Sequence, residues 1–345
     1  MTIKKTTKLG GSASGITIAK TGHGLMMMTW VPTPVPDEQA FEAIKAGLDS
    51  LPPNTKMLIN SGEFYGFNPR QANLELVARF FEKYPEYADK AFLSVKGGYK
   101  ADSMVLDTSC ENIRRTIDVI LAKLRGTKRL DLFELSRMAP EEHSVEENMA
   151  VLKALVAEGK FDHVGLSEVS ADTVRKANAV VPVAAVEIEV SPWSYSDEVK
   201  NVIATCKELS IPVVAYSPLG RGFLTGQVKR PADLEPGDFR LRLSRFKEDA
   251  MAHNFALVDA LVGVAAKKGI TPAQLAIAWV SARGPHVVPL PGSSHKTRTL
   301  ENLAGGDVEL TDAELAEIDA VREAHGVQGG RYVDELGDKA LHLMV

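Results

Sequence analysis

Tyr65 and Lys96 are the residues of this chain whose types and placement are best suited to proton transfer. Each follows a short apolar run, Met57–Asn60 or Phe92–Val95, typical of a strand buried on both faces of a parallel sheet. Reducing a carbonyl with hydride leaves an alkoxide that must be protonated, so a positioned acid is needed. A tyrosine hydroxyl has a pKa of about 10, which a neighbouring ammonium lowers. The alternative is a rim tyrosine and an unrelated exposed lysine.

These two residues belong to a chain in which short apolar runs alternate with longer amphipathic segments. Thr108–Glu111 and Ser144–Glu147 have the pattern of capping boxes at the start of two such helices. Eight strand–helix steps predict a closed (β/α)8 barrel rather than an open doubly wound sheet, with the active site at the carboxyl ends of the strands. The predicted strands are Gly24–Met28, Met57–Asn60, Phe92–Val95, Leu130–Leu135, His163–Leu166, Ala184–Val190, Pro212–Tyr216 and His286–Pro289.

Three segments depart from this alternation, and the whole chain, 1–345, is interpreted as one barrel domain. Residues 1–20 are predicted to form a hairpin covering the barrel floor, because Leu9–Ile18 places a Gly/Ser turn between two extended stretches. Residues 217–250 form a long connection and 327–345 a helix-poor tail. Long connections in compact domains are commonly functional, so we expect both to overhang the barrel mouth as cofactor and substrate loops.

The composition argues against nucleic acids and membranes as binding partners. The chain has 345 residues and a formal net charge of -5, with no basic footprint for nucleic acid and no polybasic stretch for an anionic membrane. Its apolar runs are shorter than the roughly 20 residues of a membrane span. Two cysteines, Cys110 and Cys206, and no signal peptide lead us to expect a reduced, cytoplasmic protein with a small-molecule partner. The sequence does not indicate an oligomeric state.

Several enzyme classes are disfavoured by missing motifs. Gly22-His23-Gly24 lacks the third glycine of a Rossmann turn and runs into a predicted strand rather than a helix. None of the seven tyrosines has a lysine four residues later, which argues against a short-chain dehydrogenase. The sequence shows no P-loop or nucleophile elbow, and its eight histidines lack ligand spacing, so no metal site is predicted.

Six segments, in order, resemble the motifs of the aldo-keto reductase family. The resemblance spans residues 22–310 and implies a TIM barrel that uses NADPH to reduce a small-molecule aldehyde to an alcohol. Any one motif alone is weak, whereas six at successive strand ends form a specific pattern. The segments are Ile59–Gly66, Leu93–Lys96, Asp131–Arg137, Val164–Glu168, Val213–Gly220, and Pro289–Ser293 with Leu300–Asn302.

The resemblance also implies a role for individual residues. Tyr65 is the general acid and Lys96 tunes it, with Asn60 and Ser136 completing the catalytic group. Trp30 and Arg137 are expected to contact substrate, and Tyr216 to stack under the nicotinamide ring. Arg298 is expected to carry most of the contact to a 2′-phosphate, which favours NADPH over NADH. The remaining expected cofactor residues are Ser167, Glu168, Glu187, Ser217, Leu219, Gly222, Ser293, Ser294, His295, Glu301 and Asn302.

Four of these positions depart from the family pattern. The family has aspartate where this chain has Asn60 and histidine where it has Ser136; most relatives have asparagine at Glu168 and glutamine at Glu187. A carboxylate accepts but cannot donate like an amide, so it would hold only the NH2 of the nicotinamide carboxamide. With Asn60 neutral, we expect Lys96 to be uncompensated and to lower the pKa of Tyr65 further.

The departures at Asn60 and Ser136, with Met28-Thr29-Trp30 and Leu290–Ser294, are similar to the yeast-type pyridoxal reductases. A positive pocket would hold the ionised ring hydroxyl of pyridoxal, and the small Ser136 would leave room for its substituted ring. Three alternatives remain open: a broad aldehyde or aryl-alcohol reductase, an NADPH-sensing regulatory subunit like the potassium-channel β-subunits, and an inactive relative.

Overall fold

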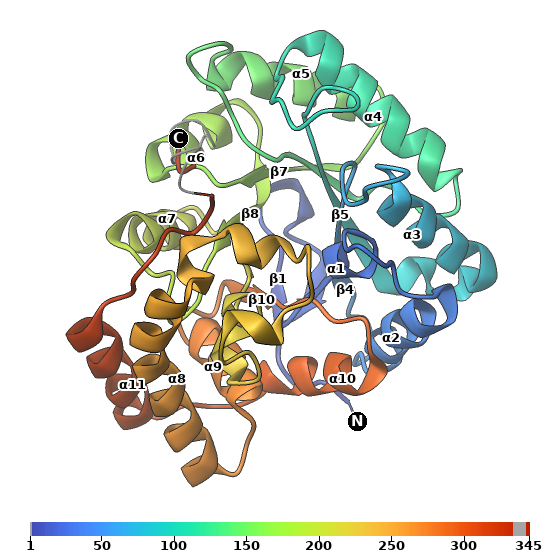
Figure 1. Cartoon of the computed structure of the whole chain (residues 1–345). Helices are drawn as coiled ribbons and strands as arrows, with labels where there is room; N and C mark the ends of the chain where they lie inside the picture. Colours follow the sequence, from blue (N-terminus) through green and yellow to red (C-terminus); the bar gives the residue numbers. More distant parts are fainter. Residues whose placement is uncertain (1, 334–342) are drawn as a thin grey trace.

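Eight parallel strands curl into a nearly closed barrel in the computed structural model, which describes residues 2–333 and 343–345 (Figure 1). The barrel closes where the Gly22 amide donates to the Pro289 carbonyl at 2.9 Å and the Gly24 amide to the Pro291 carbonyl at 3.0 Å. The (β/α)8 prediction is therefore confirmed. The barrel strands are β3 (His23–Gly24), β4 (Met57–Gly62), β5 (Ala91–Gly97), β6 (Leu132–Leu135), β7 (His163–Ser167), β8 (Val183–Glu189), β9 (Val213–Tyr216) and β10 (Val287–Leu290).

Helices surround the barrel and bury its outer face (Figure 1). The outer ring contains α2 (Asp37–Asp49), α3 (Ala72–Lys83), α4 (Cys110–Leu124), α5 (Val145–Ala157), α6 (Ala171–Val180), α7 (Asp197–Glu208), α9 (Pro272–Ser281) and α10 (Lys296–Gly305). The predicted capping box at Ser144 and Glu147 is confirmed. The one at Thr108 is wrong: Ser109 is the N-cap and accepts from the Asn112 amide, and Thr108 lies one residue too early to reach that turn.

The first predicted strand, Gly24–Met28, is wrong beyond its first residue. Strand β3 has two residues, and the chain then forms the short helix α1 (Met26–Thr29). Leu25, Met28 and Thr29 are buried, whereas Met26 and Met27 are half-buried, which is the three-to-four-residue spacing of a helix face. An unbroken apolar run carries no periodicity that would separate the two structures.

The predicted amino-terminal hairpin is present at the floor of the barrel. Strands β1 (Thr6–Lys8) and β2 (Thr17–Ala19) pair antiparallel, with the 3-10 turn η1 (Gly11–Ala13) between them. The Gly10 amide donates to the Ala184 carbonyl at 2.9 Å, at the beginning of β8. Apolar side chains of the hairpin pack against residues near the strand starts. They include Leu9, Ala13, Ile18, Leu58, Phe92, Leu132, Val214 and Val288.

Two long segments lie at the opposite end. The connection from β9 to α8 (Glu248–Lys268) winds through η3 (Gly220–Thr225), η4 (Pro231–Asp233), η5 (Phe239–Arg242) and η6 (Ser244–Phe246). After α11 (Asp312–His325), the tail passes under this connection: the Gly330 amide donates to Ser244 Oγ at 2.7 Å. Of the predicted tail, residues 334–342 lie outside the described residues.

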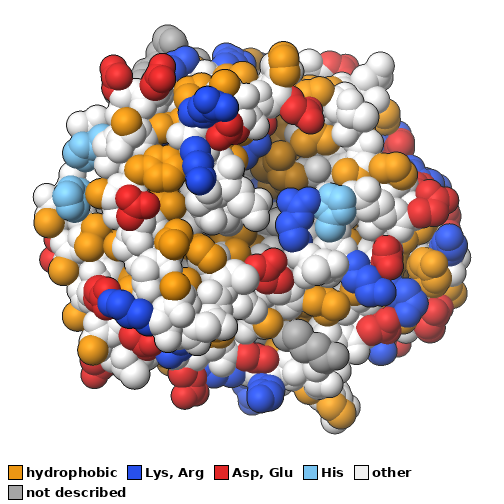
Figure 2. Space-filling view, turned by 60° about the horizontal axis from the view of Figure 1, so that its bottom comes forward, with side chains coloured by type: hydrophobic (Ala, Val, Ile, Leu, Met, Phe, Trp, Pro, Cys, Tyr) orange, Lys and Arg blue, Asp and Glu red, His pale blue; other side chains and the backbone are white. Residues whose placement is uncertain are grey.

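Helix α8 is, within the described ranges, the one helix that is long and apolar enough to cross a membrane. It packs against α9, α11 and η3, as a core helix does. Figure 2 shows a face on which charges of both signs are interspersed with apolar side chains, and which is hollowed near its centre.

Candidate active site

A cluster of buried polar side chains lies inside the carboxyl end of the barrel. Asn60, Lys96, Glu134 and Glu187 come from β4, β5, β6 and β8, and each is at most 6% exposed. Lys96 is the register partner of Glu134 on β6, which sets the two side chains at the same level. Parallel strands therefore bring together charges that are far apart in the sequence.

Lys96 is the centre of this cluster. Its Nζ donates to Asn60 Oδ1 at 3.0 Å and to Glu187 Oε1, and Glu134 Oε1 lies 3.8 Å away. Asn60 Nδ2 donates to Glu187 Oε2 at 2.8 Å and to Glu134 Oε1 at 3.3 Å. Burial alone would lower the pKa of Lys96, but Glu187, Tyr65 and Glu134 raise it above its ordinary value, so the lysine is an ammonium.

Tyr65 lies beside this ammonium. Lys96 Nζ is 5.8 Å from the centre of the Tyr65 ring, and the Trp30 ring stacks on the Tyr65 ring with 5.6 Å between the ring centres. The ring packs directly on Gly62, where an added Cβ would come within 2.9 Å of it. Gly62 is thus required for this placement of Tyr65.

The loop carrying Tyr65 is held by a chain of buried hydrogen bonds. Asn73 on α3 donates to the Leu25 carbonyl at 2.9 Å and to Thr29 Oγ1 at 2.7 Å, while Ser61 Oγ donates to Asn73 Oδ1. Thr29 Oγ1 in turn donates to the Tyr65 carbonyl at 2.6 Å. The short helix α1 therefore positions the candidate acid, although its residues were expected to form a strand.

The expected electrostatics of Tyr65 are wrong. Burial raises the pKa of its hydroxyl to about 12; the Lys96 ammonium opposes that rise, and Glu187 and Glu134 add to it. Lys96 is not uncompensated, because two carboxylates surround it. Their charge comes from β6 and β8, and a reading of β4 alone could not include it.

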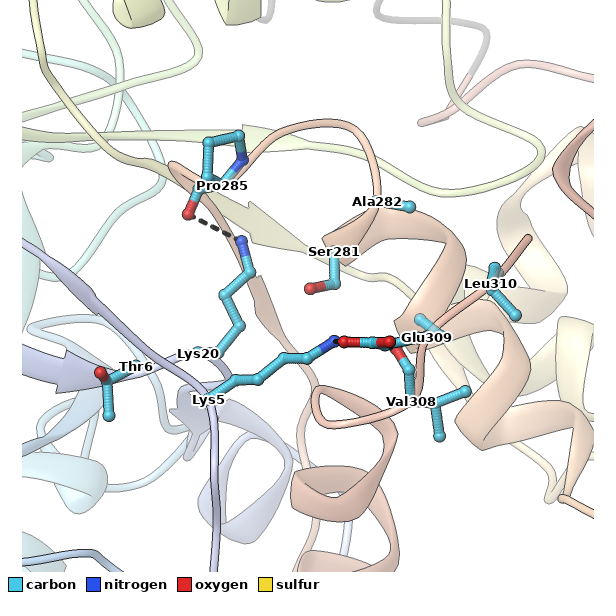
Figure 3. A pocket seen from close by; sticks show the side chains of 10 residues that line it. Lys5, Thr6, Lys20, Ser281, Ala282, Pro285, Val308, Glu309 and Leu310 are labelled. Carbon is cyan, nitrogen blue, oxygen red and sulfur yellow. Dashed lines mark hydrogen bonds and ion pairs between the residues drawn. The ribbon is translucent and has the colours of Figure 1, made fainter. Parts of the chain in front are cut away.

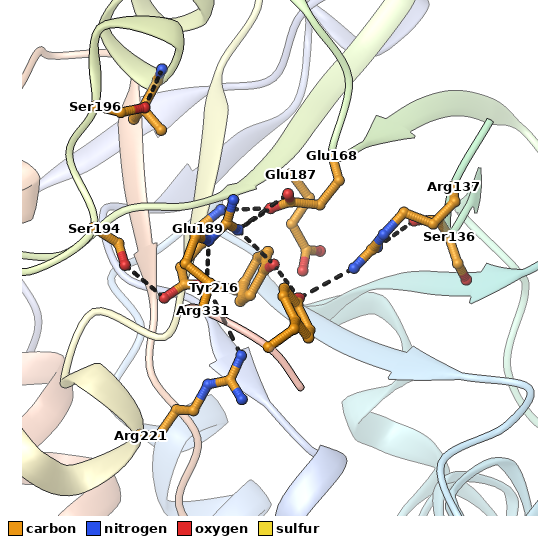
Figure 4. A network of polar contacts seen from close by, with 12 residues as sticks. Ser136, Arg137, Glu168, Glu187, Glu189, Ser194, Ser196, Tyr216, Arg221 and Arg331 are labelled. Carbon is orange, nitrogen blue, oxygen red and sulfur yellow. Dashed lines mark hydrogen bonds and ion pairs between the residues drawn. The ribbon is translucent and has the colours of Figure 1, made fainter. Parts of the chain in front are cut away.

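Ser136 and Arg137 follow β6 at the mouth. Ser136 Oγ is buried and, among the described residues, has no hydrogen-bond partner. Arg137 donates to the Ser136 carbonyl and to the Tyr332 hydroxyl, the latter at 3.1 Å (Figure 4). Ser136 is thus buried just after β6, while Arg137 reaches the tail.

A second charged network lies toward β7, β8 and β9. Arg331, from the tail, donates to both oxygens of Glu168, at 2.9 and 3.0 Å, and to Glu189 Oε2 at 2.9 Å (Figure 4). Burial opposes ionisation of Glu189, yet Arg331, Arg221 and Arg245 hold its pKa at about 2. Glu168, whose carboxylate was expected to hold the NH2 of the nicotinamide carboxamide, is therefore paired with an arginine of the tail in this structure.

The expected cofactor residues on β7 and β9 face the same mouth. Ser167 Oγ is buried without a partner in the part of the chain that the structure describes. The Tyr216 hydroxyl lies 2.7 Å from that of Tyr332. After β9, Ser217 and the three successive residues Gly220, Arg221 and Gly222 have positive φ, which curls the chain tightly past Leu219.

The last group of expected cofactor residues lies at the start of α10. Ser293 Oγ accepts from the His295 amide at 3.2 Å, and Gln39 donates to the Ser294 carbonyl at 3.1 Å. Arg298 is exposed, Glu301 is half-buried and Asn302 is buried. This group is thus separate from the Lys96 cluster and lies on the outer rim.

Glu134, Glu189, Arg331 and Tyr332 were not identified from the sequence. The signal for Glu134 and Glu189 was present, because a carboxylate inside a buried strand needs a partner. Arg331 and Tyr332 gave no such signal, since they stand in a tail without periodicity. Their contacts depend on the path of the tail back to the mouth.

Another cleft lies at the far end of the barrel, near the hairpin (Figure 3). Burial lowers the pKa of Lys20 in this cleft to about 8, helped by Lys5. Its Nζ donates to the Gly284, Pro285 and Val287 carbonyls, which use all three of its protons. We assign this lysine a structural role.

Comparison with known proteins agrees with the geometry at the mouth. The Aldo/keto reductase family profile matches residues 20–323. The chain belongs to the aldo-keto reductase family. It is therefore an oxidoreductase with a TIM-barrel fold, and this family uses nicotinamide cofactors.

Curated relatives of this aldo-keto reductase include two named for pyridoxal. A probable pyridoxal reductase 2 of Schizosaccharomyces pombe is 38% identical over 94% of this chain and 97% of its own length. A putative pyridoxal reductase of Saccharomyces cerevisiae is 34% identical over 90% and 95%. Among solved structures, a glycerol dehydrogenase from Gluconobacter oxydans superposes with a TM-score of 0.79, at 23% identity over 93% of this chain and 96% of that one, and supports the fold alone.

Proposed function

We propose that this protein reduces an aldehyde to an alcohol with NADPH, that pyridoxal is its substrate and pyridoxine its product, and that Tyr65 is the general acid. The observation that carries the proposal is the buried Lys96 ammonium beside Tyr65 at the carboxyl end of the barrel. The S. pombe and S. cerevisiae relatives named for pyridoxal support the choice of substrate.

The residues at the mouth fit a nicotinamide. The buried Ser167 hydroxyl lacks a partner within the described residues, which suits a carboxamide that can donate and accept. The Tyr216 ring and the Glu187 carboxylate lie on the neighbouring strands β9 and β8. When bound, the cofactor supplies the hydride. Another S. pombe relative, 37% identical over 81% of this chain and 82% of its own length, is an aldo-keto reductase named for NADP(+).

The charged rim fits the phosphates. Arg221 lies in the tight turn after β9, and its guanidinium is 3.9 Å from Glu189, at the edge of the mouth. The first turn of α10 presents His295, Lys296 and Arg298 to solvent at a helix N-terminus. A helix start with exposed cations favours a phosphate dianion.

The substrate side of the mouth is aromatic. Trp30 and Tyr99 flank Phe64, with ring centres 5.7 and 4.8 Å from it, and Tyr65 adjoins the same group. Arg137 lies among Tyr99, Tyr332 and Tyr216. Aromatic rings can stack on the pyridine ring of pyridoxal, and a guanidinium can hold its ionised ring hydroxyl.

Tyr65 is suited to finish the reaction. Because its pKa is about 12, the hydroxyl is protonated at neutral pH. The alkoxide left after hydride transfer is a stronger base than a phenolate, so the proton passes to it. Lys96, held by Asn60 and Glu187, then stabilises the resulting phenolate by its charge.

The direct test is steady-state reduction by the purified protein, with pyridoxal compared with a panel of aromatic and aliphatic aldehydes. We expect pyridoxal to have the highest kcat/KM. Tyr65→Phe should lower kcat by about 100-fold or more and leave the Kd for NADPH unchanged, because the ring stays and the proton is lost. A Tyr65→Phe variant with near-native kcat would refute the assignment of the acid.

The same panel separates the alternatives. Phe67 at the aromatic side of the mouth is 65% exposed, and this open side favours a broad aldehyde or aryl-alcohol reductase as the second candidate. Similar kcat/KM values for several aldehydes of the panel would support that alternative. An NADPH-sensing regulatory subunit would bind the cofactor tightly, turn over none of the aldehydes and retain a protein partner in a pull-down.

A further inference from the structure

The charge that balances Lys96 comes from β8 instead of β4. Asn60 on β4 is neutral where the family pattern has aspartate, and Glu187 on β8 is charged where that pattern has glutamine. The carboxylate expected at position 60 is absent, and the carboxylate of Glu187 is present on the opposite side of the barrel. Both side chains contact the same Lys96 ammonium.

The hydrogen bonds make the two changes depend on each other. The Asn60 amide uses both its ends: Oδ1 accepts from Lys96 at 3.0 Å, and Nδ2 donates to Glu187 Oε2 at 2.8 Å. An aspartate at position 60 has no proton to donate at neutral pH, so its oxygen would face a carboxylate oxygen of Glu187. Asparagine is thus the residue that fits between Lys96 and Glu187.

Glu134 completes the arrangement. It accepts from Ser94 Oγ at 3.2 Å and from Asn60 Nδ2 at 3.3 Å, and its Oε1 is 3.8 Å from Lys96. Burial and the Glu187 charge raise the pKa of Glu134 well above its ordinary value, while Lys96 opposes the rise. Lys96 and Glu187 therefore form the closest ion pair of the cluster, and Glu134 is the second acidic group beside it.

We propose that Glu187 is the positioning residue that balances and orients Lys96, and that Asn60 and Glu187 form one unit in which the counterion of Lys96 comes from β8 instead of β4. The proposal deepens the proposed function and rests on it only for the kinetic measurements. It assigns Glu187 a role toward Lys96 in addition to the cofactor role that the resemblance implied.

Two single variants and their combination test the unit. Glu187→Gln removes the counterion but keeps an amide where the family has one, and Asn60→Asp adds a carboxylate beside two others. We expect each to lower kcat by about tenfold or more, and the double variant Asn60→Asp/Glu187→Gln to recover to within about threefold of the native enzyme.

The pH dependence distinguishes a counterion from a merely structural residue. The charged and titratable groups around Tyr65 and Lys96 are Glu134, Glu187, Tyr99 and Tyr216. Since the Glu187 charge raises the pKa of Tyr65, Glu187→Gln should move the alkaline limb of kcat to lower pH by about one unit. The double variant should move it back.

A titration without turnover keeps this proposal separable from the proposed function. Tyrosinate absorbance of each protein minus that of its Tyr65→Phe counterpart reports Tyr65 alone, whether or not any aldehyde is reduced. We expect Tyr65 to ionise at lower pH in Glu187→Gln than in the native protein. Exposed Glu86→Gln is the matched control and should change neither titration nor kcat.

Two results would overturn the proposal. One is a Tyr65 titration that is the same in Glu187→Gln and native protein. The other is a double variant no more active than the weaker single variant, with all variants folded by circular dichroism. Absence of aldehyde reduction by native protein would instead count against the proposed function.

Discussion

Arg298 is the residue expected to distinguish the two nicotinamide dinucleotides. It is exposed in the first turn of α10, three residues after the N-cap His295. We predict that Arg298→Ala raises the KM for NADPH by roughly tenfold or more, the value of a charged hydrogen bond of about 1.5–3 kcal/mol, and changes the KM for NADH less than about twofold. Arg129→Ala, at a salt bridge with Asp162 on the surface, is the control. An equal loss for both cofactors would contradict a 2′-phosphate contact.

The sequence was sufficient to group the candidate catalytic residues, but it did not show which carboxylates lie beside Lys96. Tyr65, Lys96 and Asn60 lie at or just after the carboxyl ends of neighbouring strands, so the topology of a parallel barrel brings them together. Whether Glu134 and Glu187 point inward depends on strand register, which a single sequence with few alternating residues does not define. The pKa of Tyr65 was expected in the wrong direction for this reason, and because burial outweighs Lys96.

Among the elements, β3 and β10 meet at the seam that closes the barrel, where the Gly22 amide donates to the Pro289 carbonyl and the Gly24 amide to the Pro291 carbonyl. The buried His23 reinforces it by donating from Nε2 to the Ser293 carbonyl at 2.8 Å. Burial lowers the pKa of His23 below 6.5, although the hydrogen bond to Ser293 opposes this. The imidazole is therefore neutral in the folded protein at neutral pH.

This burial predicts acid destabilisation of the seam. An unfolded chain takes up a proton at His23 below pH 6.5 while the folded one does not, so stability present above pH 6.5 is lost as the pH falls toward the folded pKa, by up to about 1.4 kcal/mol per pH unit. In His23→Gln the amide replaces the Nε2 donor and does not titrate. We expect its Tm to fall less between pH 7 and pH 5 than that of the native protein.

The comparison of slopes isolates His23 from the other histidines. Burial also lowers the pKa values of His163 and His286, but both remain in the variant and contribute equally to the two proteins. Parallel Tm slopes for variant and native protein would show that His23 is not responsible.

At this scale the sequence predicted kinds of element better than their limits. Strands β4 to β10 were all recognised, because short, buried and mostly apolar parallel strands are distinct from the amphipathic helices between them. Strand β3 was overextended into α1, and the N-cap of α4 was placed at Thr108 instead of Ser109. Both errors concern the limits of an element, which depend on one or two hydrogen bonds that form only when the neighbouring segments are in place.

For the whole molecule, the tail after α11 joins the outer helices to the barrel mouth. Arg331 neutralises two buried carboxylates, Glu168 and Glu189. The Tyr332 hydroxyl is hydrogen-bonded to the Tyr216 hydroxyl and accepts from the Arg137 guanidinium. A segment without secondary structure is thus fixed by charge, and nothing in its sequence spacing indicated those partners.

We predict that Arg331→Met lowers the free energy of unfolding by roughly 3 kcal/mol, because it leaves buried carboxylate charge without its main partner. Urea denaturation measures the change. Adding Glu168→Gln should regain part of the loss by removing one of the two charges. A single variant as stable as the native protein would show that Arg221 and Arg245 suffice for Glu189.

The stacking of Trp30 on Tyr65 makes Trp30 an intrinsic fluorescence probe of the site. The two rings lie 5.6 Å apart with an angle of 21° between their planes, next to the position proposed for the substrate. An aromatic ligand or a reduced nicotinamide that enters this space should quench the indole emission. The chain has three tryptophans, so the part of the quenching that disappears in Trp30→Phe reports occupancy of the site. Filling of the mouth can then be followed in real time without a label and before any product forms.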